Sequence, residues 1–213
     1  MSEKLDIRQL SLEELTEKLV ALGEKPFRAK QVHEWLWKKR ATNFSDMTNL
    51  SLSLRKLIEE HFIINAIKLS EAQKSDDRTI KNAFLLADDA VIEGVLIPTK
   101  KRMTACVSVQ VGCSLDCAFC ATGKLKRVRN LNPDEIYDQV VMISNQAKEE
   151  YNIPLSNIVF MGMGEPLLNY KSVISSIDKI TSKQGLGMSP KRITVSTAGI
   201  AKMIHKLADD EVR

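Results

Sequence analysis

Three of the four cysteines of the chain, Cys113, Cys117 and Cys120, follow one another in the spacing C-x3-C-x2-C. Thiolates are soft anionic ligands, and at such short range they repel each other unless a cation binds them. The cation could be zinc, although structural zinc sites take four ligands, commonly as two separated pairs. It could also be an iron–sulfur cluster, of which the ordinary ferredoxin type likewise takes four cysteines. Three protein thiolates on a four-iron cluster would leave one iron open to a substrate.

The fourth cysteine, Cys106, lies close before the other three, so no cysteine is placed to join distant loops. This clustering argues against a disulfide framework and favours metal chemistry in a reducing compartment. The beginning of the chain lacks the basic-then-apolar pattern of a signal peptide. No apolar run approaches the ~20 residues of a membrane-spanning helix. We therefore expect a cytoplasmic protein that does not enter a membrane.

The composition is that of an ordinary soluble globular protein, with 213 residues, 44% of them hydrophobic and 27% charged. The net charge of +4 is only a weak indication of an anionic partner. The local distribution of charge says more, because short basic runs occur at 38–40, 100–102 and 124–129. A single basic run is more typical of a solvated face, but the last two flank the cysteines, which favours a polyphosphate substrate.

The first 65 residues predict a helical accessory module that resembles RNA-binding modules. Ser11 and Glu14 have the spacing of a capping box, and leucines follow at helical intervals. Pro26 suits the first turn of a second helix, and Ser51 can cap a third. Trp35 could stack on a base, but core packing is the expectation for a short helical bundle.

Residues 66–100 change to the alternating pattern of strands and predict a β-hairpin region that links two larger parts. Strands are expected over 67–73, 79–87 and 90–97, with Asp88 and Asp89 in a tight turn between the last two. Glu93 lies inside the last of these strands, and the pattern alone predicts that its carboxylate points to solvent.

Residues 101–213 repeat a strand, a loop and a helix three times, which predicts a parallel sheet or barrel. The strands are expected at 103–111, 157–162 and 192–196, and each precedes a helical stretch. Functional sites of such folds gather where the strands end, and there the cysteines, the Gly162–Glu165 turn and Ser196 all fall. The fold class expected is therefore α/β, with an incomplete, partial TIM-like βα barrel after the helical module and the hairpin region. Since three units do not close a barrel, we expect a fragment of a longer protein.

Four ordered motifs resemble the RlmN/Cfr family of radical S-adenosylmethionine (SAM) RNA adenine methyltransferases; they lie at 105–113, 129–131, 161–169 and 193–199. The RlmN branch is the closer, because it also carries a leading helical module. The resemblance implies a [4Fe-4S] cluster whose open iron binds the amino and carboxylate groups of SAM. It also implies rRNA and tRNA substrates, an electron donor such as flavodoxin or ferredoxin, and a monomer when the protein is full length.

The activity that the resemblance implies is methylation of carbon 2 of adenosine. This carbon is electron-poor and cannot attack a methyl sulfonium as a nucleophile, whereas a carbon radical can add to it. In the family mechanism a protein cysteine carries the methyl group, and a 5′-deoxyadenosyl radical activates it. A base then removes the carbon 2 proton, and a second cysteine releases the product by forming a disulfide with the carrier.

The resemblance also assigns roles to single residues. The cluster ligands correspond to Cys113, Cys117 and Cys120, and the turn that holds the methionine end of SAM corresponds to Glu165 and Pro166. Ser196 corresponds to a hydroxyl contact to the cofactor, or it only caps the next helix. Glu93 corresponds to the proton acceptor, and Cys106 to the resolving thiol, for which the alternative is a small buried apolar residue. No cysteine follows Cys120, so the carrier is missing and we expect this chain alone not to methylate RNA.

Two other functions compete with this interpretation. All four cysteines could form a zinc site in an RNA-binding module, or the chain could belong to another radical SAM enzyme, such as an activase or a sulfur-inserting protein. The helical module and the basic flanks argue against the second alternative.

Overall fold

The computed structural model describes residues 4–210, which form two compact units. One unit comprises the chain up to residue 66 together with 179–187, and the other comprises 67–178 and the residues from 188 onward. The outer ends of the predicted regions 1–65 and 101–213, namely residues 1–3 and 211–213, lie outside the described range.

The first unit contains the three predicted helices: α1 (Leu12–Ala21), α2 (Phe27–Trp37) and α3 (Leu52–His61). The capping box at α1 is confirmed, since Ser11 Oγ accepts from the Glu14 N–H and the Glu14 carboxylate accepts from the Ser11 N–H. Ser51 caps α3 as predicted.

The module is not purely helical, which corrects the expectation from its sequence. Two short strands, β1 (Leu5–Asp6) and β2 (Phe62–Ile63), pair in parallel and join its beginning to its end. The physical reason is the buried carboxylate of Asp6, which accepts hydrogen bonds from the backbone N–H groups of Arg8 and Asn65.

The core of this unit contains Trp37 and not Trp35. Trp37 is only 2% exposed, and Lys179 Nζ lies 3.8 Å from the centroid of its ring. Trp35 is partly exposed, donates its indole N–H to Asn49, and carries Lys39 over its ring. The core-packing prediction for Trp35 is therefore wrong. Residues two positions apart lie on nearly opposite faces of a helix, and the buried face of α2 consists of Ala29, Val32, Leu36 and Trp37.

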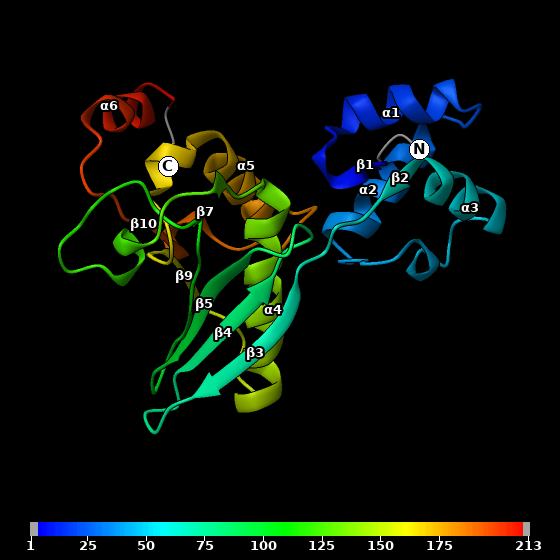
Figure 1. Cartoon of the computed structure of the whole chain (residues 1–213). Helices are drawn as coiled ribbons and strands as arrows, with labels where there is room; N and C mark the ends of the chain where they lie inside the picture. The colour runs from blue at the N-terminus through cyan, green and yellow to red at the C-terminus, as the bar shows by residue number, and fades with distance from the viewer. Residues whose placement is uncertain (1–3, 211–213) are drawn as a thin grey trace. The chain divides into compact units, whose positions relative to one another are not determined.

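The second unit is built on a six-stranded sheet with the strand order β10-β9-β6-β5-β4-β3. Its strands are β3 (Lys68–Lys74), β4 (Ile80–Leu85), β5 (Val91–Pro98), β6 (Met103–Cys106), β9 (Asn157–Phe160) and β10 (Ile193–Val195). Strands β3 to β6 pair in antiparallel fashion, and β6, β9 and β10 are parallel. The hairpin region 66–100 thus extends the same sheet that the βα units form, and its long strands run beside α4 in Figure 1.

The expected alternation of strands and helices is confirmed by α4 (Pro133–Tyr151), α5 (Tyr170–Thr181) and α6 (Ala201–Asp209). Helix α4 begins at the capping box of Asn132 and Glu135, with Pro133 in its first turn. It lies close to β5 at Gly94, where an added Cβ would lie 3.2 Å from Ile143 and 2.7 Å from Phe84. The sheet residues that face α4 therefore form the core of the unit.

The strand expected over 103–111 is broken, and the break shapes the cysteine loop. β6 ends at Cys106, and a separate strand, β7 (Gln110–Val111), pairs in antiparallel fashion with β8 (Arg129–Asn130). The break occurs at Ser108, whose backbone N–H and C=O both bond to the buried side-chain amide of Gln139 instead of to a neighbouring strand. The β7–β8 pair closes the base of the loop 112–128.

Candidate cofactor site

A pocket of 330 Å³ lies where the parallel strands end. Its walls come from three separate segments: the cysteine loop, the turn after β9 and the loop after β10. Six of the residues singled out from the sequence line it, namely Cys113, Cys117, Cys120, Glu165, Pro166 and Ser196. The structure therefore brings together the proposed cluster ligands and the proposed cofactor contacts.

The cysteine loop is held at its base and open at its tip. The backbone N–H of Cys113 donates to the Leu125 carbonyl, and the N–H of Cys120 donates to that of Cys117. Gly112 has a φ of +72°, and an added Cβ would lie 2.2 Å from the Lys126 carbonyl oxygen. Only glycine fits at this crossing. At the tip Phe119 is 94% exposed, and it lines the pocket.

The turn after β9 places a buried carboxylate in the pocket wall. Glu165 is 4% exposed, and its two carboxylate oxygens accept from the backbone N–H groups of Leu167 and Ala198 at 3.0 and 2.8 Å. The Glu165 side chain thereby ties the β9 turn to the loop after β10. Gly162 is needed because an added Cβ would lie 2.7 Å from the Val107 backbone.

Cys106 lies at the end of β6, outside the pocket lining. It is connected to the pocket through Met161, whose backbone N–H hydrogen-bonds to the thiol. Burial raises the pKa of the Cys106 thiol, and this hydrogen bond opposes the effect. The thiol is therefore held mainly in its protonated form at neutral pH.

Glu93 on β5 is half-exposed, and its carboxylate lies 3.1 Å from Lys81 Nζ. It does not line the pocket. Val95 pairs with Cys106 in the sheet, and Glu93 is two residues from Val95, so Glu93 and Cys106 share one face. The sheet face opposite to α4 thus carries both the proposed proton acceptor, Glu93, and the proposed resolving thiol, Cys106.

All four cysteines are free thiols. Within residues 4–210, no three or more His, Cys, Asp or Glu side chains converge closely enough to hold a single metal ion, and Cys106 does not join the loop cysteines. A four-iron cluster makes a different demand, because each cysteine binds its own iron and the thiols surround the cluster. Three cysteines that line one pocket together with a buried glutamate suit that group.

Comparisons with known proteins agree with this geometry. Residues 5–64 match the sequence profile of the ribosomal RNA large subunit methyltransferase N-terminal domain, and residues 107–212 match that of the radical SAM superfamily. A probable dual-specificity RNA methyltransferase RlmN from Christiangramia forsetii is 61% identical over 99% of the chain. The dual-specificity RNA methyltransferase RlmN from Syntrophus aciditrophicus is 43% identical over 97% of it.

The chain belongs to the RlmN family of radical SAM proteins. A crystal structure of a radical SAM methyltransferase from Sphaerobacter thermophilus is 37% identical, with a TM-score of 0.85 over 96% of this chain. The chain spans about 60% of the length of these RlmN relatives and of that structure. As a member of the radical SAM superfamily it has a [4Fe-4S] cluster and SAM as its cofactors.

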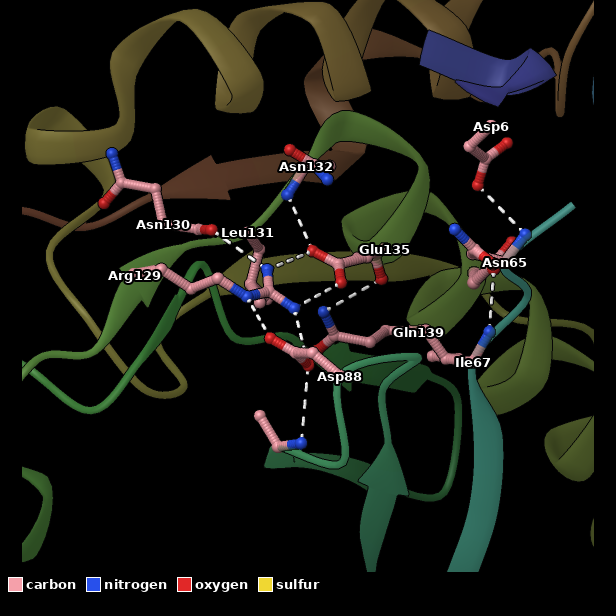
Figure 2. A network of polar contacts seen from close by, with 12 residues as sticks. Asp6, Asn65, Ile67, Asp88, Arg129, Asn130, Leu131, Asn132, Glu135 and Gln139 are labelled. Atoms are coloured by element: carbon pink, nitrogen blue, oxygen red, sulfur yellow. Dashed lines mark hydrogen bonds and ion pairs between the residues drawn. The ribbon is translucent and has the colours of Figure 1, made fainter. Parts of the chain in front are cut away.

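In this RlmN-family chain the last arginine of the basic run 124–129 is part of the scaffold, unlike the exposed lysines before it. Figure 2 shows the Arg129 guanidinium between Asp88 in the β4–β5 turn and Glu135 in the first turn of α4. Four hydrogen bonds of 2.6–3.0 Å join it to the two carboxylates. They hold the pKa of Asp88 below its usual range, with the Arg129 hydrogen bond as the main cause. Arg129 thus fixes the exit of the cysteine loop to the sheet and to α4.

Sequence reasoning missed several buried amides behind the pocket of this RlmN-family site. Asn169 donates to the backbone carbonyls of Val109 and Leu131, both at 2.8 Å, and Gln110 bonds to two segments at once. For Gln110 the available signal was a polar residue inside an otherwise apolar strand, since a buried amide must be hydrogen-bonded.

Proposed function

We propose that the chain is the RNA-recognising and cofactor-binding part of a methyltransferase that modifies carbon 2 of adenosine in large-subunit rRNA and in tRNA. The observation that carries the proposal is the shared pocket, which the three loop cysteines line together with Glu165, Pro166 and Ser196. When bound, the cluster and SAM supply the radical chemistry that an electron-poor carbon requires. The RlmN relatives, named as dual-specificity RNA methyltransferases, support the RNA substrates.

The residues that line the pocket have different proposed roles. Cys113, Cys117 and Cys120 would hold the cluster. The Glu165 carboxylate keeps lone pairs beyond its two backbone hydrogen bonds, which suits an ammonium group. Pro166 stiffens the turn, and the exposed Ser196 hydroxyl offers a further polar contact.

On the face of the sheet opposite to α4, Glu93 would accept the carbon 2 proton and Cys106 would act as the resolving thiol. Solvent reaches the Glu93 carboxylate, so a base at this position can pass its proton on to water. The methyl-carrying cysteine of the family mechanism is not among these 213 residues, because none follows Cys120. We therefore propose that this chain alone does not transfer the methyl group.

We propose that the enzyme acts in the cytoplasm and receives electrons from flavodoxin or ferredoxin. The full-length protein is proposed to be a monomer. In the described range 4–210 no helix has the length and apolar character needed to cross a membrane.

The experiment that tests this function is anaerobic reconstitution of the chain with iron and sulfide, followed by addition of SAM. We expect acid-labile sulfide, a cluster whose electron paramagnetic resonance spectrum changes when SAM is added, and no 2-methyladenosine in added rRNA or tRNA fragments. Zinc without sulfide would instead support the zinc-binding module, and formation of 2-methyladenosine would contradict the proposed lack of a carrier.

We propose that RNA contacts the solvent-exposed face of α2. This basic-aromatic face consists of Phe27, Arg28, Lys30 and Trp35 of α2, together with Lys38 and Lys39, which directly follow the helix. Phe27 is 48% exposed with Arg28 stacked over it, and Lys39 Nζ lies 3.9 Å from the Trp35 ring centroid. Exposed rings among cations are the combination that binds phosphates and stacks on unpaired bases.

Replacing Lys30 and Lys39 by glutamine is expected to weaken binding of an RNA stem-loop. The slope of log K against log salt concentration should fall by about 2, since each lost phosphate contact removes about 1. The check is a fluorescence anisotropy titration at several salt concentrations. The control is the equally charged pair Lys18→Gln and Lys56→Gln on α1 and α3, which should leave the slope unchanged; equal losses in both variants would mean that the face has no special role.

A further inference from the structure

The side chain of Gln110 is completely buried, and no role proposed above uses it. It lies in β7, at the base of the cysteine loop, directly opposite Asn130 in β8. Its Nε2 donates to Asn130 Oδ1 at 2.7 Å. Its Oε1 accepts from the backbone N–H of Glu165 at 3.0 Å. One amide therefore joins the strand that leaves the cysteine loop to the residue proposed to hold the ammonium group of SAM.

The turn after β9 is shaped to fit this side chain. Gly164 has a φ of +96°, and an added Cβ would lie 2.5 Å from Gln110 Cβ and 2.6 Å from its Cγ. The backbone N–H groups of Val109 and Gln110 also donate to the Met163 carbonyl at 2.8 and 3.2 Å. The turn thus packs directly on Gln110, without space for another side chain.

The chemistry of this position requires an amide. The side chain must donate at one end and accept at the other, and glutamine does both without carrying a charge. An apolar side chain of the same length would leave the Glu165 N–H and Asn130 Oδ1 without their Gln110 partner. Asn130 Oδ1 would keep its contact with Arg127, at 3.2 Å. The buried Glu165 N–H would lose the acceptor that fixes its place, so the turn would shift.

We propose that Gln110 is a positioning residue that keeps the cysteine loop and Glu165 in register, so that the cluster and the methionine end of SAM are held by one rigid frame. This inference rests on the proposed function. Gln110 does not line the pocket itself and acts through Glu165 and Asn130. Its removal should therefore impair SAM binding more than cluster binding.

The test replaces Gln110 by methionine, which keeps the length and removes both hydrogen bonds. In the reconstituted chain we expect iron and sulfide contents within about twofold of the unsubstituted chain, and a Kd for SAM raised about tenfold, as for other residues that support a ligand's partner. Iron and sulfide analysis gives the first quantity. A SAM titration followed by the change in the cluster's electron paramagnetic resonance spectrum gives the second.

The chain offers a matched control in Gln146 of α4, which exchanges two side-chain hydrogen bonds of 2.9 Å with the buried Asn82 of β4. Gln146→Met also removes a glutamine–asparagine pair, but away from the pocket. A structural loss alone would therefore affect both variants in the same way. We expect the Kd for SAM to change only in Gln110→Met.

Asn130→Ala separates the two hydrogen bonds, because it removes the acceptor of Gln110 Nε2 and leaves Gln110 Oε1 to accept from the Glu165 N–H. We expect a Kd for SAM between those of the unsubstituted chain and Gln110→Met, and this variant alone decides the matter if the methionine variant does not fold. A Kd for SAM unchanged in both variants would overturn the inference and leave the proposed function intact. Failure of the unsubstituted, cluster-loaded chain to bind SAM would overturn both.

Discussion

Replacing Cys117 by serine is expected to reduce the iron and acid-labile sulfide bound by the reconstituted chain by at least about tenfold. A serine hydroxyl stays protonated at neutral pH and is a hard, weak ligand for iron, so only two thiolates would remain in the loop. Reconstitution followed by iron and sulfide analysis and the visible absorbance spectrum measures the effect. We expect the chain to keep its fold, because the hydrogen bond that the Cys120 N–H donates to Cys117 goes to the main-chain carbonyl, which serine also provides.

Cys106→Ser is the matched control for that change. It alters the same functional group, but at the end of β6 and outside the pocket lining. We expect this variant to keep its iron and sulfide. Loss of the cluster from Cys106→Ser to the same extent would argue for a site built from all four cysteines, as in the zinc-binding alternative.

Replacing Arg129 by methionine is expected to lower the free energy of unfolding by about 2 kcal/mol. The substitution leaves the Glu135 carboxylate, only 8% exposed, without its cation, and removal of one partner from a buried pair is costly. The expected loss in free energy of unfolding lies below the usual range for buried pairs, because the Arg129 side chain is 29% exposed and that of Asp88 is 46% exposed. Urea denaturation of the metal-free chain, followed by far-ultraviolet circular dichroism, gives the change in midpoint.

The comparison for Arg129 is Lys74→Met. Lys74 and Glu150 form an ion pair of 2.9 Å, but both side chains are about half-exposed. A surface pair of this kind contributes little, so we expect a much smaller loss of stability than in Arg129→Met. Similar losses in the two variants would show that Arg129 does not anchor the loop.

Much of the fold could be predicted from the sequence, because its elements carry strong local signals. The caps at Ser11, Ser51 and Asn132 mark three helix starts, and the alternating pattern marks the hairpin strands. The break in the strand after Cys106 could not be predicted, because it depends on Gln139, a residue far along the chain that competes for the backbone of Ser108. Local pattern contains no information on such a long-range contact.

The candidate site was predictable to the extent that its chemistry is concentrated in short motifs. The cysteines and Glu165 stand out by type and spacing, and the parallel order of the strands brings them together. Gln110 and Arg129 do not stand out, since a single amide in a strand and one arginine in a basic run are common. Their roles follow only from the partners that the fold gives them. The most distant of those partners are Glu165, 55 residues from Gln110, and Asp88, 41 residues from Arg129.

The β7–β8 pair has a consequence for how the protein matures. It ties the two ends of the cysteine loop to the scaffold through protein contacts alone, while the exposed tip stays reachable from solvent. A carrier protein that delivers iron and sulfur could therefore load the folded polypeptide without unfolding of its sheet. The same exposure leaves the bound cluster accessible to dissolved oxygen, so we expect the visible absorbance of the cluster to be lost when the protein is handled in air.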